Sequence, residues 1–130
     1  MTEKHKISIF SEKLAVCRFD KDNSIPSWAL NRHFICITRT EEELSLIVPE
    51  ALVPDNCLHD KCWQRVKVEG PLDLTLYGVL AALITPLGKE GISVLAVATY
   101  DTDYFLVKET QMEQAISLLQ NEGYDVSRKA

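Results

Sequence analysis

The sequence has no apolar run that approaches the roughly 20 residues needed to cross a bilayer, because Gly, Pro or a charged residue interrupts each one. It also has no basic tract, and its formal net charge is −5. The opening segment, Met1–Lys6, leads into too few apolar residues for a signal peptide. These absences argue against a membrane span, secretion and a nucleic-acid partner, and they favour the cytoplasm.

Motifs of known enzyme classes are missing as well. The sequence has no P-loop, no GxGxxG and no recognisable nucleophile motif. His5 and His33 lie in terminal or turn-like polar contexts, and His59 lies in a polar stretch. Asp101-x-Asp103 is similar to a metal-binding DxD segment, but its place in a tight hairpin favours a turn. We therefore expect no enzyme, no catalytic residues and no cofactor.

The four cysteines do not form a metal-binding pattern. Cys17 and Cys36 lie in strand-like runs, where cysteine usually acts as a small buried apolar residue. Cys57 and Cys62 flank His59, but no second Cys or His pair nearby completes four zinc ligands. A loop with reduced thiols and no metal is the expectation, which agrees with a cytoplasmic location.

Length and composition are those of an ordinary globular protein. Its 130 residues fit one domain or two small domains that share a core. Apolar residues make up 46% of the chain and charged residues 25%, as is typical of soluble proteins. The chain is therefore long enough to bury a sizeable core.

The C-terminal half alternates between strand and helix patterns. Trp63–Glu69 predicts a strand that Gly70-Pro71 ends, and Asp73 or Thr75 can cap the helix that follows. The apolar stripe of this helix consists of Leu76, Val79, Leu80, Leu83, Ile84 and Leu87. Pro86 should bend or divide the helix near Ala82, and Gly91 should end it.

The same half continues with two strands, a helix and an edge strand. Residues 92–99 predict a central strand, 100–102 a turn and 103–108 the returning strand. Thr110–Glu113 has capping-box form, Gly123 ends the second helix, and residues 124–126 can form an edge strand. The apolar stripe of that helix consists of Met112, Ala115, Ile116 and Leu119. This β-α-β-β-α-β order predicts an α+β, ferredoxin-like fold, an antiparallel sheet with both helices on one face.

The N-terminal half reads as a reduced version of the same order. Its predicted elements are strands over 6–10 and 13–19, a short helix over 24–30, a hairpin with strands 34–38 and 44–48, and a polar loop over 53–61. The acidic turn Glu41–Glu43 could suggest a metal site, but a solvated hairpin tip is the better interpretation. Because no sequence repeat is visible, the internal symmetry is a hypothesis from the pattern alone.

Residues 63–109 resemble the ACT-domain proteins in Val68–Asp73 and Thr99–Glu109, and Thr99–Tyr104 is the most specific part. The closer match is to the small tandem-ACT group related to the animal cytosolic arginine sensors and to the regulatory part of aspartate kinase. Ala15–Arg18, Pro26–Ala29 and Glu43–Glu50 resemble the N-terminal half of that group. The resemblance implies two ferredoxin-like ACT units, residues 1–61 and 62–130.

The resemblance also implies a function and a site. ACT domains generally bind amino acids or other small effectors at contacts between domains. By position, the implied ligand-binding residues are Gly70, Asp73, Leu76, Thr99, Tyr100 and Asp103. Asp73 departs from the longer acidic side chain of the arginine sensors. Those sensors have about twice as many ACT units, so a homodimer is expected here.

Two alternatives remain open from the residues alone. Asp73 could serve only as a helix cap, and Asp101 and Asp103 could serve only to shape the hairpin turn. The chain could correspondingly be a protein-interaction module without a ligand. In either case no catalytic domain is expected on this chain, so regulation would act on a partner enzyme.

Overall fold

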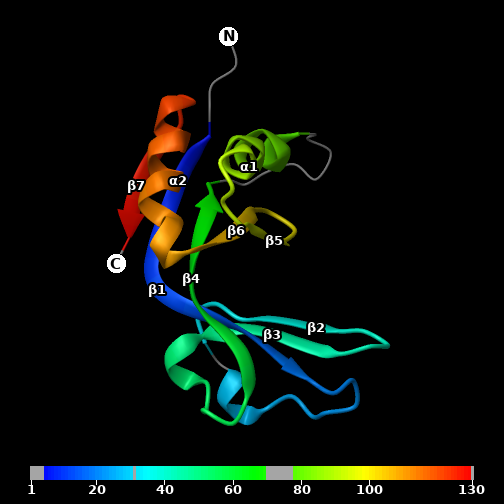
Figure 1. Ribbon diagram of the computed structural model, residues 1–130. Helices are drawn as coiled ribbons and strands as arrows, with labels where there is room; N and C mark the ends of the chain where they lie inside the picture. Colours follow the sequence, from blue (N-terminus) through cyan, green and yellow to red (C-terminus); the bar gives the residue numbers. More distant parts are fainter. Residues whose placement is uncertain (1–4, 31, 70–77, 130) are drawn as a thin grey trace. The chain divides into compact units, whose positions relative to one another are not determined.

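The structure, a computed structural model, describes residues 5–30, 32–69 and 78–129 (Figure 1). By internal contacts the chain forms two units, one made of residues 1–11 and 64–130 and the other of residues 12–63. We call them the split unit and the inserted unit. The boundary between 61 and 62 that the sequence suggested lies near the second junction. The first residues, however, belong to the split unit because Lys6–Phe10 pairs with its last strand.

Two long strands belong partly to each unit. β1 (Lys6–Phe19) is one continuous strand of 14 residues, so the prediction of two short strands joined around Ser11-Glu12 was wrong. β4 (Leu58–Val68) begins five residues before Trp63, inside the segment predicted as a polar loop. Both errors have one cause. These stretches carry exposed polar side chains, which interrupt the apolar alternation by which a strand is recognised.

The split unit has the predicted β-α-β-β-α-β order from β4 onward. Its elements are β4, α1 (Val79–Lys89), β5 (Leu95–Ala98), β6 (Asp103–Lys108), α2 (Glu109–Asn121) and β7 (Asp125–Lys129). The strand order within the unit is β7-β1-β4-β6-β5. β7 is an edge strand, as predicted, but it pairs in parallel with β1, from Lys6↔Asp125 to Phe10↔Lys129. The N-terminal strand thus lies between the first and last strands of the βαββαβ pattern.

Both helices pack on one face of these strands, as the sequence predicted. Leu83 and Leu87 of α1 are fully buried in one cluster with Val66, Val68 and Phe105 from the strands. The predicted stripe of α2, Met112, Ala115, Ile116 and Leu119, is buried in the same cluster. Among the described residues, no helix combines the length and apolarity that crossing a membrane requires.

The helix ends follow the predicted glycines, but α2 lacks its predicted capping box. Gly91 and Gly123 have positive φ angles of 77° and 94° just after α1 and α2. α2 begins at Glu109 without a side-chain cap, so the predicted capping box is not used. α1 runs through Pro86 without division. Proline removes a single backbone hydrogen bond there, and the buried leucines of α1 hold the helix on the core.

β5 differs from the central strand that was predicted over residues 92–99. It lies at the end of the strand order, covers only Leu95–Ala98, and alternates between half-buried and exposed side chains. The apolar residues before β5 belong to the segment that connects α1 to β5. Ile92 is buried, and its N–H donates to the Leu87 carbonyl at 3.0 Å. The apolar run was therefore predicted as a strand, although its first part is a buried connection between α1 and β5.

The inserted unit repeats the order in reduced form. β1 is followed by the 3₁₀ turn η1 (Ser27–Ala29), β2 (Cys36–Arg39), β3 (Leu44–Pro49), the 3₁₀ turn η2 (Glu50–Leu52) and β4. The helix predicted over residues 24–30 is thus a single turn after Pro26. Its small core contains Ala15, Cys17, Ala29, Leu44, Leu46 and Val48. Trp28 packs at the edge of that core, with its ring centroid 6.4 Å from that of Phe19.

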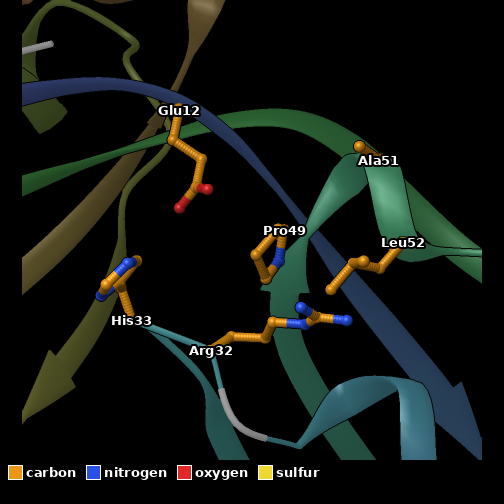
Figure 2. Close-up of a pocket in the computed structure, with 6 residues that line it drawn as sticks. All are labelled: Glu12, Arg32, His33, Pro49, Ala51 and Leu52. Atoms are coloured by element: carbon orange, nitrogen blue, oxygen red, sulfur yellow. The ribbon is translucent and has the colours of Figure 1, made fainter.

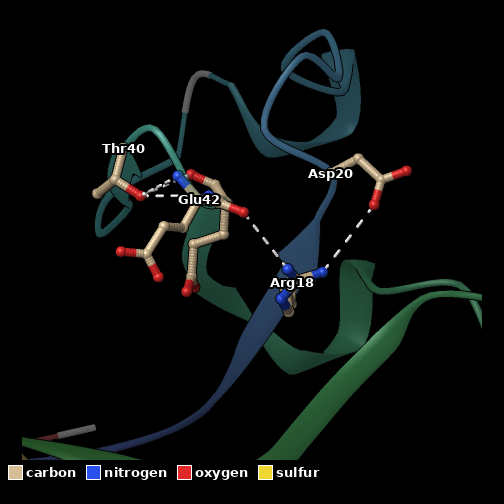
Figure 3. A network of polar contacts seen from close by, with 5 residues as sticks. Arg18, Asp20, Thr40 and Glu42 are labelled. Atoms are coloured by element: carbon tan, nitrogen blue, oxygen red, sulfur yellow. Dashed lines mark hydrogen bonds and ion pairs between the residues drawn. The ribbon is translucent and has the colours of Figure 1, made fainter.

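The β2–β3 hairpin tip is held by local hydrogen bonds (Figure 3). The Thr40 hydroxyl accepts the N–H groups of Glu42 and Glu43 at 3.1 and 3.2 Å. Arg18 donates to the Glu42 carbonyl and lies 4.0 Å from an Asp20 carboxylate oxygen. In the part of the chain that the structure describes, no three His, Cys, Asp or Glu side chains gather in a way that could hold a metal ion. The acidic tip is therefore a hydrogen-bonded turn.

Candidate functional site

The β5–β6 hairpin carries three of the six predicted ligand-binding residues. Its register pairs Ala98 with Asp103, so residues 99–102 form the turn. The N–H and hydroxyl of Thr99 both donate to the Thr102 carbonyl at 2.9 Å. The Thr99 hydroxyl also accepts the Thr102 N–H at 3.1 Å. Thr99 therefore closes the turn, and its hydroxyl already has partners within the chain.

The other two hairpin residues present their side chains differently. Tyr100 is 78% exposed, so its ring faces solvent. Asp103 is half-buried, and among the described residues its carboxylate makes no hydrogen bond or ion pair. Asp101 places a second, exposed carboxylate on the same turn. An aromatic ring beside two acidic groups suits a cationic ligand group.

Neighbouring side chains fix the start of β6 beside β4. The Arg65 guanidinium on β4 lies 3.8 Å from the centre of the Phe10 ring and 5.8 Å from that of Tyr104. Such cation–π contacts orient both rings. Because Tyr104 follows Asp103 directly, this stack places the start of β6 near Arg65.

The other three predicted ligand-binding residues come after β4 in the sequence. Gly70, Asp73 and Leu76 lie outside the described residues, as does Thr75, the other predicted helix cap. Within the described residues α1 begins at Val79, with Gly78 at its N-cap in the left-handed region, φ 72°, and without a side-chain cap.

Glu69 anchors the end of β4 through three contacts. Its N–H donates to the Lys6 carbonyl at 2.9 Å, and the buried Ser8 hydroxyl donates to its carboxylate at 2.5 Å. Lys67 lies 3.3 Å from the other carboxylate oxygen. The Ser8 hydrogen bond is the main cause that lowers the pKa of Glu69 below its ordinary value of 4.5, with Lys67 adding to it.

We expect Ser8→Ala to lower the free energy of unfolding at pH 7 by about 1 kcal/mol, because it removes a hydrogen bond to a charged acceptor that is 34% exposed and therefore partly screened by solvent. The lowered pKa of Glu69 makes this contribution present above pH 4.5 and lost as the pH falls through the folded-state pKa. Urea unfolding at pH 7 and in acid measures the effect, and the variant should approach the parent in acid. Ser127→Ala is the control, because Ser127 is exposed opposite Ser8. Equal losses at both serines would contradict the assignment.

All four cysteines are free thiols, and Cys17 is buried as predicted, whereas Cys36 is half-buried. Burial, and next the neighbouring Cys57 thiol, raise the pKa of Cys17 to about 12. His59 and Cys62 lie on β4 and not in a loop. Cys62 has a positive φ of 70°, and its N–H donates to the Glu50 carboxylate at 2.7 Å. This segment therefore serves the structure of the inserted unit.

The sequence interpretation missed one polar cavity. Glu12, Arg32 and His33 line a cavity in the inserted unit, together with the last residue of β3 and two residues of η2. They come from separate segments and match no motif. His33 was noted only for its turn-like context, so no local signal could have identified the group.

Two family models match the chain. The model of the ACT domain matches residues 58–121, and a second model, described as an N-terminal domain, matches residues 12–56. The second match covers most of the inserted unit. The first includes β4 through α2 and therefore the whole β5–β6 hairpin.

Similar proteins agree with these matches. The chain is 29% identical over 107 residues to a cytosolic arginine sensor for mTORC1, subunit 1, from Bos taurus. The match covers 74% of this chain and 32% of the relative, so the chain spans about a third of the length of the curated relative it matches.

Solved structures share the fold. A protein from Agobacterium tumefaciens is 29% identical with a TM-score of 0.92, covering 99% of this chain and 96% of that one. The regulatory subunit of aspartate kinase from Thermus thermophilus is 9% identical with a TM-score of 0.64, covering 92% and 98%. The second likeness concerns the fold alone. Residues 58–121 thus match the model of the ACT domain, and the split unit that contains most of them has the βαββαβ order.

Proposed function

We propose that the protein is a regulatory protein that binds an amino acid or a similar small effector at a contact between ACT units. The proposed ligand-binding residues are Gly70, Asp73, Leu76, Thr99, Tyr100 and Asp103. One observation carries the proposal. The half-buried Asp103 carboxylate has no polar partner among the described residues and lies on the same turn as the exposed Tyr100 ring.

This arrangement suits the cationic part of an amino acid. A carboxylate that is partly shielded from water forms a stronger charge-assisted hydrogen bond than a fully exposed one. Thr99 keeps the turn rigid, so little conformational entropy is lost when a ligand binds. The arginine sensor named above is an amino-acid sensor by its description, which supports the same class of ligand.

The remaining parts of the proposal concern the oligomeric state, the cellular location and the regulated partner. We propose a homodimer with isologous contacts, because the resembling sensors have about twice as many ACT units as this chain. Light scattering that gives only the 14.7 kDa of one chain would remove the dimer. We also propose a cytoplasmic location and a partner enzyme as the regulated protein, with no catalytic residue on this chain.

A thermal screen across the amino acids tests the function. A ligand present at about a hundredfold excess over its Kd should stabilise the protein by about 2.7 kcal/mol, which raises the melting temperature by several degrees. We expect one amino acid or a small related group to produce this shift. The D-enantiomer of the best ligand is the control, and it should shift the melting temperature less. If no amino acid changes the melting temperature, the alternative of a ligand-free interaction module replaces the proposal.

A further inference from the structure

The inserted unit contains a cavity of about 340 Å³ that the proposed effector site does not use. It is lined by Glu12, Arg32, His33, Pro49, Ala51 and Leu52. In Figure 2 the Pro49 ring lies between the Glu12 carboxylate and Arg32, and His33 lies to the left of these three residues. The volume lies at the lower end of the range for small-molecule sites, so it suits a small metabolite.

Strand pairing brings the walls of the cavity together. In the β1–β3 pair Leu14 lies opposite Pro49, so Glu12 lies just beyond the end of β3, where the chain turns into η2. Pro49 is buried, and Glu50 is tied to β4 by the 2.7 Å hydrogen bond from the Cys62 N–H. The apolar floor is therefore held in place by the packing of the inserted unit.

The charged groups on the rim are not engaged with one another. Among the described residues, the side chains of Glu12, Arg32 and His33 make no hydrogen bond or ion pair. The other arginines of the inserted unit are engaged. Arg18 contacts Asp20 and the Glu42 carbonyl, and Arg39 donates to the carbonyls of Lys21 and Asn23. Arg32 is thus the arginine of this unit whose guanidinium remains available to a ligand.

We infer that this cavity is a second binding site, which takes a small aliphatic α-amino acid in its zwitterionic form. The Arg32 guanidinium binds the α-carboxylate through its planar fork of N–H donors. The Glu12 carboxylate accepts hydrogen bonds from the α-ammonium, and the aliphatic side chain packs on Pro49 and Leu52. His33 supplies ring nitrogens at another edge of the cavity, on the left in Figure 2.

The mixed charges select against simpler ligands. An anion without an ammonium group is repelled by Glu12, and a cation without a carboxylate is repelled by Arg32. Long or charged side chains do not suit the apolar floor and the small volume. Because the rim groups are exposed, each charge contributes modestly, and an affinity near the millimolar range is expected.

NMR titration of the full ¹⁵N-labelled chain tests the inference. The probes are glycine, L-alanine, L-valine and L-leucine at roughly 10 mM, a concentration above a millimolar Kd. We expect the amide signals of Arg32, His33, Ala51 and Leu52 to move with at least one of them. Isovalerate lacks the ammonium of L-valine and isobutylamine lacks its carboxylate, and each should bind about tenfold more weakly or not at all.

Variants separate this site from the hairpin site. Arg32→Gln should weaken binding about tenfold, whereas Arg18→Gln, a matched change in the same unit, should leave it unchanged. Asp103→Asn should also leave the shifts at residues 32–52 unchanged, so failure here and failure of the proposed effector site are distinguishable. The inference is overturned if none of the four amino acids moves these amides, or if Arg32→Gln binds as tightly as the parent.

Discussion

Phe105→Ala is expected to lower the free energy of unfolding by about 3–5 kcal/mol, the range for truncating a fully buried phenylalanine. Phe105 has no exposed surface, and among the residues that the structure describes it is the largest fully buried side chain. From β6 it packs in one cluster with Leu83 of α1 and Met112 of α2. Removing its ring leaves a cavity under both helices, which the backbone of a paired strand cannot move to fill.

Urea unfolding followed by circular dichroism measures this loss. Tyr100→Ala is the control, because it truncates an aromatic side chain of similar size that is 78% exposed. Its effect should stay within about 0.5 kcal/mol. A loss below about 1.5 kcal/mol at Phe105 would contradict the central place of β6 in this core.

Local patterns predicted most of the split unit. The helical stripe of Met112, Ala115, Ile116 and Leu119 is buried as expected, and glycines follow both helices in the left-handed region. β6 has the predicted bounds, Asp103–Lys108. These features could be predicted because each depends on residues a few positions apart, whose periodicity reports which face is buried.

Pairing between distant segments could not be predicted in the same way. β7 pairs with β1 across more than a hundred residues of sequence, and no sequence feature of either strand predicts this pairing. The exposed polar residues at the centre of β1 hid its continuity. β5 was mistaken for a central strand because apolar residues in a buried link and in a strand look alike. Burial from tertiary packing, rather than local preference, decided each of these cases.

The hairpin site and the cavity of the inserted unit differ in how far local sequence predicts them. The hairpin residues 99–103 are contiguous, so the turn itself was predictable from Tyr100, Asp101 and Thr102. The hydrogen bond from the Thr99 hydroxyl to the Thr102 carbonyl could not be predicted, because side-chain hydrogen bonds depend on the geometry of the turn. The cavity in the inserted unit joins Glu12 to Arg32 and to the end of β3, and only folding brings these together.

Asp103→Asn is expected to weaken binding of the effector by roughly 10- to 150-fold, the equivalent of losing about 1.5–3 kcal/mol from one charge-assisted hydrogen bond. The change keeps the shape of the side chain while removing its charge. The hairpin register at Ala98↔Asp103 depends on the backbone, so the fold should be preserved. The melting temperature without ligand should accordingly stay close to that of the parent.

Calorimetry with the amino acid that gives the largest thermal shift measures both affinities. Asp101→Asn is the matched control, because it removes the same charge two residues away from a side chain that is exposed at the turn. General attraction by negative charge would weaken both variants alike and would become small at high salt. A specific contact at Asp103 weakens that variant alone and persists at high salt, because a half-buried pair is screened less. Equal affinities for Asp103→Asn and the parent would leave Asp103 with the role of a turn residue, and the effector site would then rest on the segment after β4.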